Sequence, residues 1–317
     1  MKSVFCLGDI CMDLVLPYGS VLRSRRGEPI SRAQTDVVFR HGGSAANTAA
    51  ALLKLGVPVS FCGTVGADLH GAALKSELAA LGADVSALRC DPNVPQLLIA
   101  IVVDETGERT AFATQRTNAS QHRILPEQVP DDLCDRIVLL HTTGVLLREE
   151  PAASVVLQTM RRCRDAGIPI ALDVMARIES RSDPVFLENL RTAASYATIL
   201  FGSVRDELPL LTDDDSEDAL LTLAKGDRIV CARDGSRGAV VYTERGVYRC
   251  PAFSVPVADT IGAGDAYNAG FLSAYLRGAS LADANREANA VAAICVTHTG
   301  GRATPTQKEL QTFLQSH

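Results

Sequence analysis

The stretch Asp259–Leu276, DTIGAGDAYNAGFLSAYL, joins a glycine loop to an apolar segment. Gly262 and Gly264 flank Ala263, and they allow a tight turn whose N–H groups face one side. The larger apolar residues that follow recur at helical spacing, so we expect a helix to begin directly after the loop. Such a loop is typical of an anion-binding site, because unpaired N–H groups and the positive end of the helix dipole face the same point.

Asp265 would lie in the first turn of this helix, where a carboxylate has two interpretations. It could be an ordinary helix-start acid that interacts favourably with the dipole. It could also be a general base beside a phosphate site, taking a proton from a hydroxyl that attacks the phosphate. A short glycine motif is weak evidence by itself, so the choice depends on the rest of the chain.

The composition is that of a soluble globular protein. The 317 residues are 47% hydrophobic and 21% charged, which suits one large α/β domain or two smaller ones. A net charge of −6 without a dense Lys/Arg tract argues against nucleic acid as the main partner. No apolar run is long enough to span a bilayer, and the N-terminal MKSVFCLGDI resembles a strand more than a signal peptide. Nine cysteines without a CxxC pair indicate reduced thiols in the cytoplasm, and the six histidines lack metal-site spacing.

A second glycine stretch, HGGSAANTAAALLKLG, covers His41–Gly56. Gly42 and Gly43 end a strand, and Ser44 could cap the helix that follows. The first turns are almost entirely small residues, so we expect another element to approach this helix closely. Tight packing does not explain Asn47, a polar side chain on a helix otherwise suited to packing.

A strand is expected at Ser3–Leu7, followed by Gly8 and Asp9. Open α/β sheets place ligands at the carboxyl ends of their strands. We interpret Asp9 as a turn residue. Asp13 interrupts an otherwise apolar run and is the better ligand candidate.

From Ile137 onward, strands alternate with helices, which predicts right-handed βαβ units and a parallel sheet covered on both faces. The expected strands are 137–144, 168–173, 197–201 and 228–232, and the helical segments between them are near 150–166, 183–195 and 216–225. Shorter strands at 97–103 and 109–115, together with 17–40, could form a small separate sheet that acts as a lid.

The two glycine stretches together resemble the two signatures of the PfkB (ribokinase-like) carbohydrate kinase family. HGGSAANTAAALLKLG followed by GTVGADLHG is similar to the N-terminal signature, and DTIGAGDAYNAGFL to the C-terminal one. The resemblance runs from GDICMDL to THTGG. It implies one kinase domain over residues 1–317, in a three-layer α/β/α fold with a mostly parallel central sheet. Lid segments would be inserted at about 14–40 and 95–118.

The resemblance assigns Asp265 as the base that activates the acceptor hydroxyl. The N–H groups of Gly262, Ala263 and Gly264 would hold the transferring phosphoryl group. Four residues near the N-terminus would hold the sugar, namely Asp13, Gly42, Gly43 and Asn47.

The resemblance also implies ATP, Mg²⁺ and a monovalent cation, usually potassium. Asp259 and the backbone near Ile261 and Gly300 would hold the monovalent cation. The turn 233–238 is similar to the KDGSxG segment that meets the nucleotide, and this gives as nucleotide contacts Arg233, Gly235, Ser236, Gly238 and Thr260.

The chain departs from the family in two places. The common Asn-x-x-Glu motif, which organises Mg²⁺ through water, has no Asn here. Glu207 is our choice for its acid, and Asp206 is the alternative, although both acids could simply begin a helix. The Asp-x-Asn-x-Arg segment of fructokinase-like and 2-keto-3-deoxygluconate kinase-like members keeps Arg177 but has Met175 in place of Asn.

Arg177 and Arg116 indicate the acceptor, because an arginine fork suits a carboxylate. Both could also be plain surface residues. We expect an ATP-dependent kinase for a ketose or keto-sugar acid, of the fructose or 2-keto-3-deoxygluconate type, that forms a homodimer through the lid. The alternatives are a nucleoside or ribose kinase of the same family, and a catalytically weak relative that binds a sugar or nucleotide as a regulatory module.

Overall fold

The structure is a computed structural model that describes residues 2–17, 37–103, 109–113, 119–176, 178–212 and 214–317. Arg116 and Arg177 lie outside the described residues.

The central sheet has nine strands in the order β13-β12-β11-β10-β9-β8-β1-β4-β5. All neighbours from β11 to β5 run parallel, whereas β12 and β13 are antiparallel additions at one edge. The bounds are β1 Ser3–Leu7, β4 Val59–Gly66, β5 Leu88–Asp91, β8 Ile137–Thr143, β9 Ile170–Asp173, β10 Ile199–Ser203, β11 Ile229–Arg233, β12 Ala239–Thr243 and β13 Gly246–Cys250. The mostly parallel sheet predicted from the alternation of strands and helices is confirmed.

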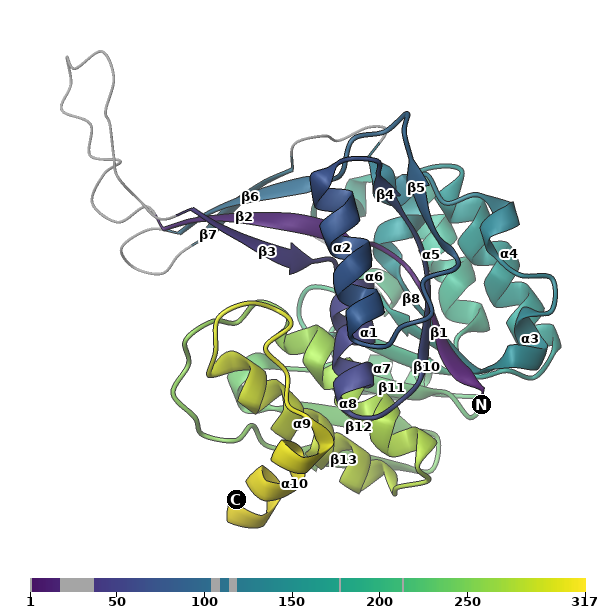
Figure 1. Cartoon of the computed structure of the whole chain (residues 1–317). Helices are drawn as coiled ribbons and strands as arrows, with labels where there is room; N and C mark the ends of the chain where they lie inside the picture. The colour runs from purple at the N-terminus through teal and green to yellow at the C-terminus, as the bar shows by residue number, and fades with distance from the viewer. Residues whose placement is uncertain (1, 18–36, 104–108, 114–118, 177, 213) are drawn as a thin grey trace, which may run out of the picture.

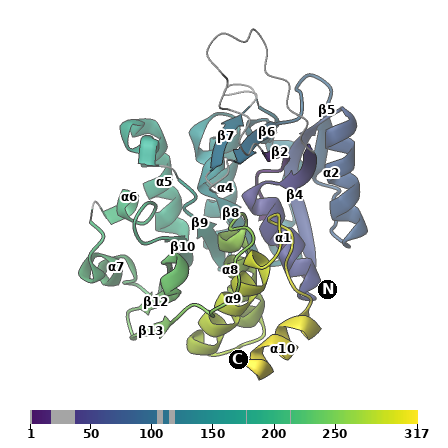
Figure 2. The same cartoon turned by 90° about the vertical axis from the view of Figure 1, so that its left-hand side faces the viewer.

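Helices cover both faces of this sheet (Figures 1 and 2). Along β1, Val4 and Cys6 point into one hydrophobic core and Phe5 and Leu7 into the other, as the two-residue period of a strand buried on both faces requires. The first core contains α1 Ser44–Lys54, α2 Leu69–Ala80, α8 Ala263–Leu276, α9 Leu281–Val296 and α10 Gln307–Ser316. The second contains α3 Leu133–Arg136, α4 Ala152–Asp165, α5 Pro184–Tyr196, α6 Pro209–Thr212 and α7 Glu217–Leu223.

A smaller sheet of four strands, in the order β3-β2-β6-β7, projects from the main body (Figure 1). Its strands are β2 Cys11–Pro17, β3 Val38–Gly42, β6 Leu98–Val103 and β7 Arg109–Ala113. We call this sheet the lid. It begins at Cys11, so Asp13 belongs to a lid strand, where it pairs with Arg40.

The small residues of α1 are explained by its packing against α8. Ala45, Ala46, Ala49 and Ala50 are completely buried, and Thr48 Oγ1 donates to the main-chain oxygen of Asp265 at 3.4 Å. The close approach predicted from these alanines is therefore made by the helix that carries Asp265. This contact brings the two glycine stretches, far apart in the sequence, to one place.

Candidate active site

The N-terminus of α8 depends on Gly262, its N-cap residue. Gly262 has a φ of 76°, a backbone conformation that residues other than glycine adopt only at a cost in conformational energy. A Cβ there would also lie 2.4 Å from the Cα of Gly301 in the loop after α9. Among the residues that the structure describes, the N–H groups of Gly262 and Gly264 have no partner, while that of Ala263 bonds the Thr260 oxygen at 3.3 Å. The start of α8 thus presents N–H groups next to Asp265, as an anion site requires.

Asp265 is buried and receives two side-chain hydrogen bonds from α1. Ser44 Oγ donates to Oδ1 at 2.5 Å, and Asn47 Nδ2 donates to Oδ2 at 2.9 Å. Burial raises the pKa of Asp265 to about 7. The two hydrogen bonds lower the pKa and the nearby Asp173 and Asp9 raise it, and burial outweighs the hydrogen bonds. A carboxyl group tuned in this way can exchange a proton near neutral pH.

The Ser44 contact corrects our expectation that Ser44 caps α1. The N-cap residue is Gly43, with a φ of 94°, and it makes no side-chain cap. Asp9 supplies the cap from across the fold, because its carboxylate accepts the Ser44 N–H at 2.7 Å and the Ala45 N–H at 3.2 Å. Asp9 is therefore a buried helix cap and not a turn residue, and the Ser44 hydroxyl is left to hold Asp265.

Asp13 lies against Gly42 at the base of the lid. A Cβ on Gly42 would come within 2.5 Å of Asp13 Oδ2, so only glycine leaves room for that carboxylate. Burial raises the pKa of Asp13 to about 6, although the Cys11 thiol, Arg302 and Arg40 lower it. Asp13, Gly42, Gly43 and Asn47 are thus gathered around one end of α1, close to Asp265.

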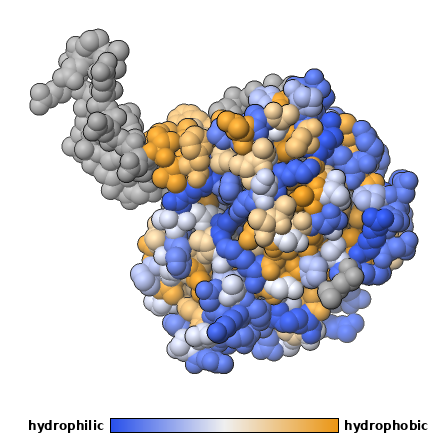
Figure 3. All heavy atoms as spheres, in the orientation of Figure 1, coloured by the Kyte–Doolittle hydropathy of each residue, from blue (hydrophilic) through white to orange (hydrophobic). Residues whose placement is uncertain are grey.

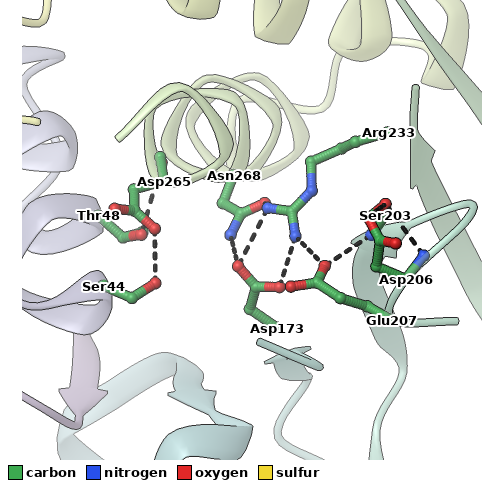
Figure 4. A network of polar contacts seen from close by, with 9 residues as sticks. All are labelled: Ser44, Thr48, Asp173, Ser203, Asp206, Glu207, Arg233, Asp265 and Asn268. Atoms are coloured by element: carbon green, nitrogen blue, oxygen red, sulfur yellow. Dashed lines mark hydrogen bonds and ion pairs between the residues drawn. The ribbon is translucent and has the colours of Figure 1, made fainter. Parts of the chain in front are cut away.

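A buried ionic network lies beside this cluster, at the carboxyl ends of β9, β10 and β11 (Figure 4). Arg233 donates to Asp173 through both terminal nitrogens, at 3.0 and 2.7 Å. It also donates to Glu207 Oε2 and to Asn268 Oδ1, each at 3.0 Å. A Cβ on Gly264 would lie 2.8 Å from Arg233 Nη1, so the guanidinium lies against the start of α8. The network of Arg233 with Asp173 and Glu207 therefore lies directly beside the start of α8.

The two acids considered for the magnesium motif are in different environments. Glu207 is mostly buried, accepts the Ser203 N–H at 2.6 Å and joins the Arg233 network, whereas Asp206 is exposed. Burial raises the pKa of Glu207, although Arg233 lowers it. Within the described part of the chain, no three His, Cys, Asp or Glu side chains lie close enough to hold a metal on their own.

The residues expected at the monovalent-cation site do lie together. Asp259 is buried and accepts the N–H groups of Ile261 at 2.8 Å and Gly300 at 2.9 Å. Arg40 Nη1 from the lid lies 3.7 Å from Asp259 Oδ2. In the same loop as Gly300, the buried Thr304 hydroxyl has no partner among the described residues. The carboxylate of Asp259 thus joins the loop before α8 to the loop that carries Gly300.

Three of the remaining nucleotide candidates lie on the surface, whereas Gly238 is buried. Gly235 and Ser236 are exposed in the turn between β11 and β12, and Thr260 is exposed before α8. Gly238 has a φ of 93°, and a Cβ there would meet the Cys250 oxygen at 2.2 Å, so glycine shapes this turn. Arg233 differs from these nucleotide candidates, because both terminal nitrogens of its guanidinium already donate within the ionic network.

Four residues of the site were not found from the sequence as functional candidates: Ser44, Asp173, Asn268 and Arg302. Asp173 carried a local signal, because it ends a parallel strand. Arg302 follows the Gly300-Gly301 pair, and its side chain bonds Asn47. The partners of the other two residues come from distant segments.

The family model for pfkB family carbohydrate kinases matches residues 1–308. The chain therefore belongs to the PfkB family of carbohydrate kinases, with the ribokinase-like fold, and is a phosphotransferase that acts on an alcohol group.

Three known proteins illustrate the similarity. An ATP-dependent ribose-1-phosphate kinase of Halopiger xanaduensis is 32% identical over 99% of this chain and 98% of its own length. A 5-dehydro-2-deoxygluconokinase of Halalkalibacterium halodurans is 26% identical over 86% of this chain and 85% of its own. The structure of aminoimidazole riboside kinase from Salmonella enterica, complexed with aminoimidazole riboside and an ATP analog, has a TM-score of 0.81. It shares 26% identity and covers 99% of this chain and 100% of that one. The chain is thus a sugar or nucleoside kinase of this family.

Proposed function

We propose that the protein transfers the γ-phosphate of ATP to a hydroxyl of a small sugar, with Asp265 as the general base. The observation that carries this proposal is the position of Asp265. It is a buried carboxyl with a pKa of about 7, in the first turn of a helix whose glycine loop presents N–H groups. Base and anion site lie within three residues of each other, so one bound phosphate can face both.

The chemistry follows from this arrangement. Asp265 takes the proton of the acceptor hydroxyl, whose oxygen then forms the new P–O bond as the bond from γ-phosphorus to the bridging oxygen of ADP breaks. The N–H groups before Asp265 stabilise charge on the transferring phosphoryl oxygens. Asp13 and Asn47 position the sugar, and a closed lid would keep water from competing with it.

Two cations belong to this proposal. Glu207 would hold Mg²⁺ through water, and the ion would neutralise charge on the ATP phosphates when bound. Asp259, with the loop that carries Gly300, would hold potassium behind the anion site. The turn at Gly235–Gly238 and Thr260 would meet the nucleotide.

For the acceptor we propose a ketose or keto-sugar acid. The support is the resemblance of the segment around Asp173 to fructokinase-like and 2-keto-3-deoxygluconate kinase-like members. A relative named as a 5-dehydro-2-deoxygluconokinase agrees with this class. The predicted roles of Arg116 and Arg177 lie outside the described residues.

Ribose 1-phosphate is a second candidate acceptor. It is favoured by the 32% identity, over 99% of this chain, to a kinase named for that substrate. Both candidate classes include anionic sugars, and Arg40 lies opposite Asp13 at the base of the lid.

We also propose that two copies associate through the lid. Phe39 and Phe112 are large apolar side chains that are more than half exposed, at 54% and 56%, and Val37 is 46% exposed. Figure 3 shows hydrophobic atoms gathered over the projecting lid sheet. An exposed apolar sheet face is typical of an association surface.

The experiment is an ATP-consumption screen with an acceptor panel: fructose, 2-keto-3-deoxygluconate, 5-dehydro-2-deoxygluconate, ribose 1-phosphate, ribose and nucleosides. We expect turnover with a keto-sugar or with ribose 1-phosphate, and turnover lower by about 10²–10⁴ with the Asp265→Asn variant. Product identification by mass spectrometry and ³¹P NMR would name the phosphorylated hydroxyl. Tight binding of a sugar without turnover would instead support the regulatory alternative, and near-normal turnover by Asp265→Asn would exclude Asp265 as the base.

A further inference from the structure

Arg302 lies in the loop after α9 and is almost completely enclosed, with 9% of its side chain exposed. Its guanidinium reaches three separate elements. Nε donates to Asn47 Oδ1 on α1 at 3.2 Å, and Nη2 donates to the Gly42 oxygen at the end of β3 at 3.0 Å. Nη1 forms an ion pair with Glu77 of α2. Arg302 therefore ties the lid strand, α1 and α2 to the C-terminal loop.

The contact with Asn47 determines how its amide is oriented. An asparagine amide has an acceptor oxygen at one corner and a donor NH₂ at the other, and a half-turn exchanges them. Arginine has donors and no acceptor, so the amide oxygen must face Arg302. The NH₂ group then faces Asp265, where it donates to Oδ2 at 2.9 Å.

The orientation that Arg302 imposes on the Asn47 amide does not depend on the charge of Asp265. If Asp265 alone oriented Asn47, protonation of the carboxyl would weaken the preference, because a protonated acid can also donate. Burial lowers the pKa of Arg302 only to about 10, so the guanidinium stays charged around neutral pH. The amide donor is thus held toward the base whether or not the base carries its proton.

We propose that Arg302 is a positioning residue for the phosphoryl transfer: by fixing the amide of Asn47, it keeps a hydrogen-bond donor on Asp265 and favours the ionised base. Arg302 touches neither substrate nor phosphate in this role, which rests on the proposed function of Asp265. A flipped amide would place its oxygen against the carboxylate and disfavour the ionised form.

Other charged or titratable groups face these two residues. Around Asp265 they are Asp9, Asp173, Arg233 and Cys295, and around Arg302 they are Cys11, Asp13, Asp9, His41, Lys54 and Glu77. Loss of the Arg302 charge would also raise the pKa of Asp13, so the Arg302→Gln comparison is repeated with Asp13→Asn in both proteins.

The test compares pH profiles of kcat/KM for the wild type with those of Arg302→Met, Arg302→Gln and Arg302→Lys. Methionine removes every donor, and glutamine offers either a donor or an acceptor. Neither side chain therefore fixes the orientation of the Asn47 amide. Lysine keeps a charged donor. We expect the acidic limb of the profile to move up by about one pH unit for Met and Gln, so that kcat/KM at pH 6 falls about tenfold and recovers at high pH. The Lys variant should stay near the wild-type midpoint.

Glutamine is the variant to interpret if methionine lowers the folded fraction, because it can keep hydrogen bonds with Gly42 and Glu77. The matched control is Glu77→Gln, which changes the ion pair without touching Asn47 and should leave the midpoint in place. A loss of activity that is equal at every pH would overturn the proposal and make Arg302 merely structural. Failure of the base assignment is separate: Asp265→Asn would then retain turnover whatever the Arg302 variants do.

Discussion

Replacement of Ser44 by alanine should move the pH dependence of turnover, because it removes one of the two side-chain donors on the Asp265 carboxylate. A hydrogen bond to a charged group contributes about 1.5–3 kcal/mol, and one pKa unit corresponds to about 1.36 kcal/mol. Loss of the donor disfavours the charged form, so the pKa of Asp265 should rise from about 7 by about one to two units.

The assay is ADP release with a saturating nucleotide, followed as kcat/KM for the acceptor from about pH 5.5 to about pH 10. At pH 6 the ionised fraction of the base falls about 10- to 100-fold in the variant, and activity should fall with it. At the alkaline end Asp265 is ionised in both the wild type and the variant, so their activities should converge.

Thr48→Val is the matched control for Ser44→Ala. Thr48 lies one turn along the same helix and bonds the main-chain oxygen of Asp265, so its loss should leave the midpoint unchanged. A Ser44→Ala profile with the wild-type midpoint would refute the argument that this hydroxyl tunes the base. An equal shift in both variants would indicate a general disturbance of α1.

Three further changes test other parts of the site. Asp265→Asn should lower turnover by about 10²–10⁴. It should also raise the thermal midpoint. Folding raises the pKa of Asp265 from 3.8 to about 7, so the wild-type protein loses up to about 4 kcal/mol of stability as the pH increases across that interval. A variant without this pH slope, measured by calorimetry, supports the assignment. Exchange of NaCl for KCl at constant ionic strength should raise kcat if Asp259 holds potassium, and equal rates would argue against that site. Arg233→Met should lower the free energy of unfolding by about 3–5 kcal/mol in urea titrations, because Asp173 and Glu207 lose their shared partner; a change within error would mean that the network does not hold these acids.

The layers of the fold could be predicted because their signals are local. The alternation of apolar strands with helices after Ile137 predicted the parallel sheet, and the glycine loop before Asp265 predicted the start of α8. Each signal lies within about twenty residues, over which hydrophobic periodicity and turn chemistry are informative.

The partners of the site residues could not be predicted in this way. Ser44 and Asp265 are 221 positions apart, and Arg302 and Asn47 are 255 positions apart. Serine is common at the N-cap position, so the sequence predicted that Ser44 caps α1. In the structure Asp9, which follows β1, caps this helix instead. Tertiary contacts decided both cases, and nothing in the spacing of these residues indicates them.

The different surroundings of the buried carboxylates explain why Asp265 can act as a base. Asp9 is held by two N–H groups of α1, and Asp259 by two N–H groups of its own loops. Asp173 faces a guanidinium. Asp265 receives two neutral side-chain donors and lies near two of these acids, which raise its pKa. Asp265, with its pKa raised to about 7, can exchange protons near neutral pH. The acids around Asp265 therefore help to tune it, and removal of the charge of Asp173 together with that of Arg233 should lower the pKa of Asp265 less than removal of Asp173 alone.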